Sequence, residues 1–319
     1  MVLNSKEKRG MGFCLLIPFL IVLMTGCSAS KNSQRGISED AYKRFVERQK
    51  ALAADEGTPK ENPVMTSEGL ERMGDFYVRQ GNLPMAFLQY DKALRLDRNQ
   101  PDIHYKMGRL FLEKGMAEEA QNEFLEVLKV NPQHAKAFEG MGWVFFKRGD
   151  FEKAEKNLQQ AVALEDTLWQ AHHLLGIIYD RQQNYEEAIG QYKKAISIKP
   201  NMAMLFNNLG MCLLLKGDYS EALKFFLEAL KLEASNDRVQ NNLGLTLCKL
   251  GRYEEALEVF KKNGDEATAY NNLGYVFMIE GKNEKAIEAF EKALEIKPGF
   301  YTKAYENLKR AKTPYTSSP

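Results

Sequence analysis

Small and large residues recur along this chain with a fixed period, and the period predicts its helices. Glycines recur every 34 residues, and a seventh follows after 30: Gly74, Gly108, Gly142, Gly176, Gly210, Gly244 and Gly274. An alanine stands twelve residues after each glycine, at Ala86, Ala120, Ala154, Ala188, Ala222, Ala256 and Ala286. A large residue stands four further on, at Tyr90, Phe124, Leu158, Tyr192, Phe226, Phe260 and Phe290. Each period predicts two antiparallel helices that approach closely at the small residues, with the large residue filling the contact to the neighbouring period.

A second set of glycines marks the predicted end of the first helix in most periods. They lie seven residues after the first set, at Gly81, Gly115, Gly149, Gly217, Gly251 and Gly281. A helix that stops there needs a residue in left-handed backbone, which glycine adopts without strain. The fourth period carries Gln183 instead, for which the same backbone costs roughly 1 to 2 kcal/mol. The sixth period is four residues shorter, and Asn263 with Gly264 is expected to end its second helix early.

These recurring positions resemble the tetratricopeptide repeat, because several independent positions recur in phase. The resemblance implies an all-α fold, a right-handed α-solenoid of about seven helix hairpins over residues 67–300. The expected units are 67–100, 101–134, 135–168, 169–202, 203–236, 237–266 and 267–300. Residues 301–319 are expected to form a capping helix and a frayed tail.

The N-terminus has the order of an export signal, a basic segment followed by the apolar stretch 11–24. That stretch is short for a membrane-spanning helix, which needs about 20 apolar residues. Small residues then precede Cys27, a pattern that resembles a bacterial lipobox. The resemblance implies that residues 1–26 are a lipoprotein signal peptide, that Cys27 carries acyl chains such as palmitate, and that Ser28 directs the protein to the periplasmic side of the outer membrane. An ordinary signal peptide with an incidental cysteine is the alternative.

Residues 27–66 are expected to form a lipid-anchored tether. Its first part is polar, and an amphipathic helix is predicted at 38–54, where Tyr42, Phe45 and Val46 fall on one side. The sequence leaves open whether this helix packs on the repeats or stays apart from them. One alternative is a structural oligomer in which the helix plugs the molecule's own groove.

Composition and charge remove several classes of function. The 44 Lys and Arg residues are balanced by 43 Asp and Glu residues, which leaves no basic patch for nucleic acid. No pair of histidines has the spacing of a zinc helix, and neither a nucleophile elbow nor a phosphate-binding loop occurs. We therefore expect no catalytic residue, no metal, no cofactor and no small-molecule substrate.

The remaining histidines and cysteines have structural interpretations. His104 and His172 share a repeat position with Phe138, so they are interpreted as rings that pack in the core. Cys212 and Cys248 fall in apolar helical contexts on different repeats and are interpreted as small buried side chains. A disulfide between them is the alternative in an oxidising compartment.

A stack of helix pairs presents the first helix of each unit on a concave wall, where a partner can bind. By analogy with the family, the wall is charged in the first two units and apolar with amides in the others. The predicted partner-binding residues are Tyr105, Arg109, Trp143, Phe146, Ile177, Met204, Asn207, Met211, Leu214, Asn241, Leu245, Asn271, Tyr275 and Met278. Apolar anchors are expected to supply the affinity, while amides fix the register of a partner backbone. For any one of these residues, burial in the core is the alternative.

The combination of an acylated N-terminus, a short tether and these repeats looks like the pilus-assembly lipoproteins of the pilotin and TadD type. The resemblance implies a scaffold or assembly chaperone for type IV or Flp pilus or secretion machinery. Its partner would be an envelope protein, such as a secretin, held as a peptide or helix in the groove. An adaptor for cell-wall hydrolases or for outer-membrane protein assembly is the alternative.

Overall fold

The computed structural model describes residues 65–298 and 302–313, which form fifteen helices and no strand. The helices belong to two compact units. The first unit ends at Lys216 and holds α3 (Ser67–Arg79), α4 (Leu83–Leu96), α5 (Pro101–Glu113), α6 (Ala117–Val130), α7 (Ala135–Arg148), α8 (Phe151–Leu164), α9 (Trp169–Arg181), α10 (Tyr185–Ile198) and α11 (Ala203–Lys216). The second begins at Gly217 and holds α12 (Tyr219–Leu232), α13 (Asp237–Lys249), α14 (Tyr253–Lys262), α15 (Glu266–Ile279), α16 (Asn283–Ile296) and α17 (Thr302–Lys312).

Four predictions concern residues outside this description. They are the signal peptide 1–26, the lipidation of Cys27, the helix at 38–54 and the end of the chain after residue 313. Within the described residues, no helix combines the length and the apolar composition needed to cross a membrane.

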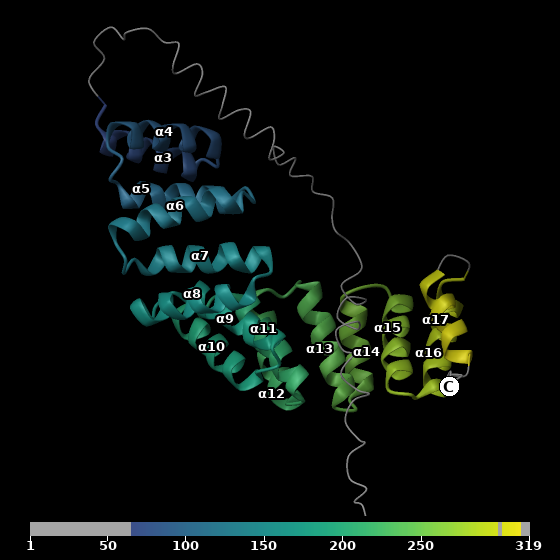
Figure 1. Cartoon of the computed structure of the whole chain (residues 1–319). Helices are drawn as coiled ribbons and strands as arrows, with labels where there is room; N and C mark the ends of the chain where they lie inside the picture. The colour runs from purple at the N-terminus through teal and green to yellow at the C-terminus, as the bar shows by residue number, and fades with distance from the viewer. Residues whose placement is uncertain (1–64, 299–301, 314–319) are drawn as a thin grey trace, which may run out of the picture. The chain divides into compact units, whose positions relative to one another are not determined.

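The first unit is a stack of helix pairs. Helices α3 and α4, α5 and α6, α7 and α8, and α9 and α10 pack as consecutive pairs, and Figure 1 shows them as successive layers. The second helix of each pair packs on the first helix of the next, and α5, α7, α9 and α11 also contact one another in that order. The first helices therefore form one wall of this unit, as in an α-solenoid.

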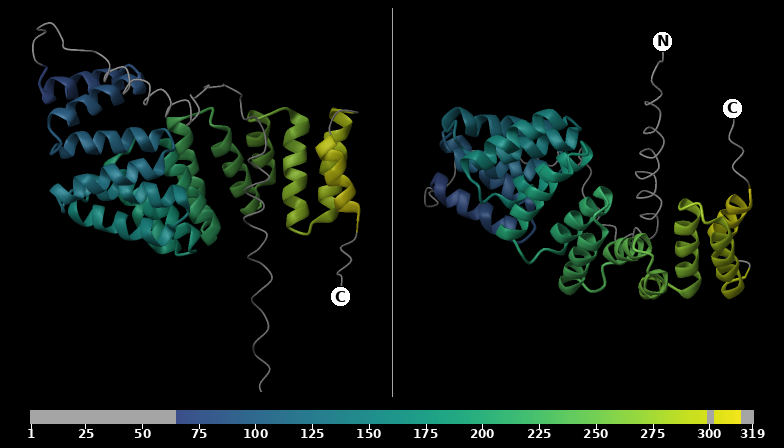
Figure 2. Two further views of the ribbon diagram at one scale, coloured as in Figure 1. Left: turned by 45° about the horizontal axis from the view of Figure 1, so that its top comes forward. Right: turned by 90° about the horizontal axis from the view of Figure 1, so that it is seen from below.

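The second unit repeats the same packing. Helices α13 and α14, and α15 and α16, form pairs, and Figure 2 shows α13 to α16 side by side. Helix α14 has 10 residues where the other second helices have 14, and Asn263 is its C-cap, which confirms the predicted early end. Helix α17 packs on both α15 and α16 and covers the last pair, which confirms the expected capping helix.

The repeat glycines make room for the large residues of their own pairs. A Cβ atom on Gly74 would lie 2.3 Å from the ring of Tyr90, and one on Gly244 would lie 2.3 Å from Phe260. Six of the large residues thus pack on the glycine of their own pair. The predicted contact with the neighbouring pair is present as well at Tyr90, since Lys106 of the next pair lies 5.9 Å from the centre of its ring. Phe124 does both, because its ring also closes on Gly140 of the next pair.

The helix-ending glycines adopt the predicted left-handed backbone, with φ between 70° and 98°. Gln183 adopts it too, with φ of 62°, which confirms that the fourth pair uses the same turn without a glycine. The backbone N–H of Gln183 donates to Asp180 and that of Asn184 donates to Tyr179, as Gly149 and Asp150 do to Phe146 and Phe145. The turn therefore has the same hydrogen bonds as the glycine turns, and the Cβ atom of Gln183 makes its left-handed backbone conformation strained.

The two described cysteines behave as buried apolar side chains. Cys212 and Cys248 are both buried and carry free thiols. Burial raises the pKa of the Cys248 thiol to about 12, so it stays protonated and unreactive at neutral pH.

Candidate partner-binding groove

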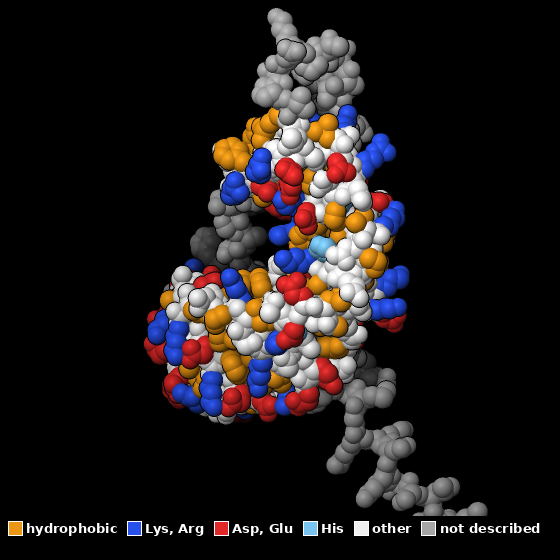
Figure 3. All heavy atoms as spheres, turned by 90° about the vertical axis from the view of Figure 1, so that its left-hand side faces the viewer, with side chains coloured by type: hydrophobic (Ala, Val, Ile, Leu, Met, Phe, Trp, Pro, Cys, Tyr) orange, Lys and Arg blue, Asp and Glu red, His pale blue; other side chains and the backbone are white. Residues whose placement is uncertain are grey.

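A groove of about 480 Å³ opens on the first unit, where α5, α7 and α9 contact one another. Tyr105, Arg109 and Trp143 of the predicted wall line it, together with residues of α3, α4 and α9. Acidic and basic side chains are interspersed over the face of the molecule drawn in Figure 3, so that face carries no field of one sign. The groove is large enough for one or two side chains of a partner.

Aromatic side chains in the groove are held by edge contacts and stay partly open. Trp143 is half-buried, and its ring meets Phe146 edge-on at 6.3 Å between centroids. Phe146 in turn packs on Phe151, which lies 4.3 Å below the guanidinium of Arg181. Contacts of this kind fix the orientation of a ring while they leave one face free for a ligand.

The charged residues at the α3 end of the groove are paired with one another. Lys106 donates to Glu71 Oε1 at 2.5 Å and to Asp75 Oδ2 at 2.8 Å, and the Tyr90 hydroxyl donates to Asp75 Oδ1 at 2.6 Å. Burial opposes ionisation of Asp75, yet the bonds from Lys106 and Tyr90 hold its pKa below the usual value. This end of the groove is consequently a closed network that links α3, α4 and α5.

Glu139 of α7 lines the same groove, but one oxygen of its carboxylate lacks a hydrogen-bond partner among the described residues. Its side chain is only 7% exposed, and its Oε1 has no hydrogen-bond partner among the described residues. Burial raises its pKa to about 6, against the backbone of Ala171 and the charge of Arg109, which favour the ionised form. Ala171 lies in the first turn of α9, whose N-cap residue Leu168 offers no side-chain hydrogen bond. The carboxylate therefore stabilises the start of α9 and retains one unused oxygen.

A polar ladder between successive first helices leaves Glu139 without a partner, and among the described residues Oδ1 of Asn241, at the same repeat position, lacks one too. The residue three positions before one repeat glycine bonds to the residue 35 or 36 positions further on, in the next first helix. The pairs are Glu71 with Lys106, His173 with Asn208 at 2.8 Å, and Asn271 with Asn307 at 3.1 Å. The corresponding partner of Glu139 is Leu174, which has no donor to offer.

The structure places the other predicted residues of the first unit outside this groove. Phe146, Ile177 and Met211 are half-buried, and Met204 is exposed. Asn207 and Leu214 are buried, so little of either side chain is available to a partner.

In the second unit, the predicted residues also differ in how much of each side chain is exposed. Asn241, Tyr275 and Met278 are half-buried, whereas Leu245 and Asn271 are each 7% exposed. The amide of Asn271 is used by Asn307, as that of Asn208 is used by His173. These amides hold helices of this chain together, and this is a different role from the expected one of fixing a partner backbone.

Sequence reasoning missed Lys106 and Glu139 as groove residues. Both are charged residues on a wall whose apolar members had been singled out. A comparison of residues 35 positions apart would have found them. Glu71 and Lys106 carry opposite charges, whereas Glu139 corresponds to the apolar Leu174.

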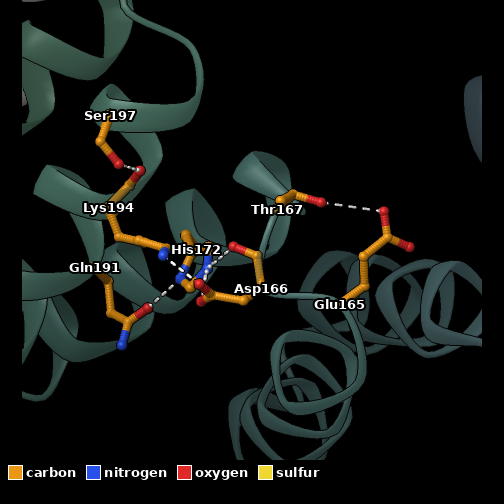
Figure 4. Close-up of polar contacts among 7 residues, drawn as sticks. All are labelled: Glu165, Asp166, Thr167, His172, Gln191, Lys194 and Ser197. Carbon is orange, nitrogen blue, oxygen red and sulfur yellow. Dashed lines mark hydrogen bonds and ion pairs between the residues drawn. The ribbon is translucent and has the colours of Figure 1, made fainter.

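His104 and His172 make the same pair of hydrogen bonds in their two repeats. His172 is buried, which agrees with its interpretation as a ring in the core, whereas His104 is only half-buried. Nδ1 of His172 bonds to Gln191 Oε1 at 2.7 Å, and its Nε2 lies 3.2 Å from the carbonyl oxygen of Asp166, as Figure 4 shows. Nδ1 of His104 likewise bonds to Glu123 at 2.7 Å, and its Nε2 bonds to a carbonyl six residues earlier. Each ring ties the loop before its helix to the second helix of the pair. The described residues contain no cluster of His, Cys, Asp and Glu that could hold a metal ion.

Solved structures resemble this chain in fold. PilW, described as a widely conserved type IV pilus biogenesis factor, is 18% identical with a TM-score of 0.55, over 65% of this chain and 97% of that one. PilF of Pseudomonas aeruginosa is 20% identical with a TM-score of 0.50, over 68% and 99% of the two chains. A tetratricopeptide repeat protein of Parabacteroides merdae ATCC 43184 is 17% identical with a TM-score of 0.52, over 77% and 99%. Identities this low show the shared fold alone, and a fold does not select a partner.

Comparison of sequences identifies the family. No curated protein matches the chain. Residues 267–300 match the tetratricopeptide repeat, the family that the glycine and alanine positions indicated. Residues 33–269, which are more than half of the chain, match the family described as the C-terminal domain of cilia and flagella-associated protein 70. The chain is therefore a tetratricopeptide repeat protein, and it belongs to the family of the cilia and flagella-associated protein 70 C-terminal domain.

Proposed function

We propose that this protein is a non-enzymatic scaffold or assembly chaperone that holds a segment of a partner protein in the groove of its first unit. The observation that carries this function is the groove of about 480 Å³ lined by the half-buried rings of Tyr105 and Trp143. Both rings come from the wall of first helices, where successive repeats align their side chains.

The energetics favour the rings as anchors. Burying a large apolar side chain completely contributes about 1.5 to 3 kcal/mol, whereas a neutral hydrogen bond contributes about 0.5 to 1.5 kcal/mol net. Lys106, Glu71 and Asp75 are already bonded to one another, so new bonds to them would replace existing ones. Affinity would then come from the aromatic contacts, and the paired charges would shape the groove.

We also propose that the protein is a lipoprotein of the outer membrane that faces the periplasm and serves pilus or secretion machinery. Cys27 and the apolar stretch before it support the anchor. The fold shared with PilW, which is described as a type IV pilus biogenesis factor, agrees with this setting without selecting it. Ile177, Met204 and Met211 of the same unit would extend the contact with the partner.

A library of random peptides displayed on phage tests the groove directly. The full chain is immobilised, and selected peptides are measured against the wild type, Tyr105→Ala and Trp143→Ala. We expect either substitution to weaken binding at least about tenfold, because a fully buried aromatic anchor is lost. Leu164→Ala is the matched control, since Leu164 is exposed at the end of α8 and is not part of the groove. Equal binding by all four proteins, or no selected peptide, would refute the proposed groove.

Fractionation of cells that produce the full chain tests the anchor separately. Cys27→Ala should move the protein from the membrane to the soluble fraction, because two or three acyl chains are lost. Cys14→Ala lies within the proposed signal peptide and should leave the distribution unchanged. A Cys27→Ala protein that still sediments with membranes would contradict lipidation at this residue.

A further inference from the structure

The unused oxygen of Glu139 is the starting point. The side chain is more than nine-tenths buried, and it belongs to the lining of the groove. Oε1 has neither a hydrogen-bond partner nor contact with solvent. A buried acceptor left in this condition is unusual in a folded protein, because its desolvation is not repaid. An oxygen of this kind at a binding surface is explained when a ligand supplies the missing donor.

The basic residues that line the groove do not supply this donor. Lys106 is held between Glu71 and Asp75, and Lys147 donates to the carbonyl oxygen of Leu112 at 2.8 Å. Arg109 lies close enough to act on the charge of Glu139, yet its hydrogen bond goes to the hydroxyl of Tyr105. The groove therefore combines an ionised acceptor with basic residues that are engaged elsewhere.

The position of Glu139 restricts the kind of donor that can reach it. The carboxylate lies below the surface of the groove and its Oε1 is closed to solvent, so the donor must stand at the end of a long side chain and the carboxylate must turn toward it. Arginine and lysine have that length, and their charge forms the stronger, charge-assisted type of hydrogen bond. Trp143 lies one turn further along α7 and lines the same groove. An indole ring attracts a cation over its face, so the two residues favour the same ligand.

We infer that the partner inserts an arginine or lysine side chain into the groove of the first unit, where Glu139 Oε1 accepts its N–H and the ring of Trp143 lies against its charge. This inference rests on the proposed function, because it names the chemistry of the partner that the groove holds.

The peptide library described above tests the inference with two further variants. Glu139→Gln removes the charge and keeps the shape, and Glu288→Gln makes the same change at an exposed carboxylate of α16 that does not line the groove. We expect wild-type protein to select peptides with one fixed basic position. Glu139→Gln should weaken a selected peptide about tenfold, as loss of a charge-assisted bond implies, while Glu288→Gln should change it less than about twofold. Replacing the basic residue of that peptide by norleucine should weaken binding to wild type more than binding to Glu139→Gln, which has only the contact with Trp143 left to lose.

The outcomes separate this inference from the function on which it rests. If peptides bind through Tyr105 and Trp143 but carry no preferred basic position, the inference is wrong and the groove function stands. The same holds if norleucine weakens binding to wild type and to Glu139→Gln equally. If no peptide is selected, both fail together. Thermal unfolding of each variant, compared with wild type, shows that a lost affinity does not come from a lost fold.

Discussion

The pairs α7–α8 and α9–α10 share one architecture but differ at two positions that the repeat would normally fix. Three residues before the repeat glycine, the first has Glu139 and the second has His173. Both side chains are buried, yet His173 accepts a hydrogen bond from Asn208 while Oε1 of Glu139 accepts none. At the end of the first helix, the first pair has Gly149 and the second has Gln183 in the same backbone. The comparison teaches that a repeat can keep its geometry while individual positions carry an energetic cost.

His173 should give the largest effect, in acid. Burial lowers its pKa from the usual 6.5 to about 4. A depressed histidine pKa adds stability above pH 6.5 that is lost as the pH falls to about 4, because the unfolded chain takes up the proton first. The shift corresponds to about 3 kcal/mol. His173→Gln keeps an acceptor for Asn208 and should remove most of this acid sensitivity, measured as urea unfolding free energy between pH 7 and about pH 4.

His104 provides the contrast for that experiment. Its hydrogen bond to Glu123 outweighs burial and raises its pKa, so its contribution is present below pH 6.5 and is lost as the pH rises through the folded-state pKa. His104→Gln should therefore make the protein less stable in weak acid relative to wild type. If both substitutions changed the pH profile in the same direction, the assignment of His173 as a buried neutral ring would be incorrect.

Glu139 should give a smaller effect of the opposite sign. Its pKa is raised from 4.5 to about 6, so its contribution to stability is present below pH 4.5 and is lost as the pH rises through 6. At pH 7 the ionised side chain then costs about 2 kcal/mol. Glu139→Gln should raise the unfolding free energy at pH 7 by about 1 to 2 kcal/mol, by the same linkage.

Glu288→Gln is again the matched control, because Glu288 is exposed and its replacement should change stability by less than about 0.5 kcal/mol. A Glu139→Gln protein that is no more stable than the control at pH 7 would show that the carboxylate is already satisfied. If Glu139→Gln is more stable than wild type and also binds peptides less well, then Glu139 lowers the stability of the fold and contributes to binding.

Much of this fold could be predicted because its determinants are local and repeated. The helix pairs, the left-handed turn at Gln183 and the early end of α14 at Asn263 each follow from residue type at a fixed offset. The packing of Tyr90 on its own Gly74 did not follow, because small and large residues at one spacing allow contact within a pair or between pairs. Packing direction depends on the angle between helices, and the pattern does not contain it.

The groove was less predictable than the fold for a physical reason. The repeat pattern predicted Tyr105, Arg109 and Trp143 as wall residues, and all three line the groove in the structure. Glu139 was missed because a polar residue on a helix is read as solvated unless its partner is known. Its partner position lies 35 residues away, at Leu174, and only the alignment of α7 against α9 shows that the two correspond.

The turn gives the smallest effect and the cleanest test of the comparison. Gln183→Gly should stabilise the protein by about 1 kcal/mol, because glycine adopts φ of 62° without the strain that a Cβ atom causes. Gly149→Ala, at the same position of the preceding pair, should destabilise it by a similar amount. A Cβ on Gly149 would meet nothing within 4 Å, so the loss would come from the backbone alone. Thermal or urea unfolding measures both changes. If Gln183→Gly left the unfolding free energy unchanged while Gly149→Ala lowered it, the glutamine side chain would have to contribute contacts that offset its strain.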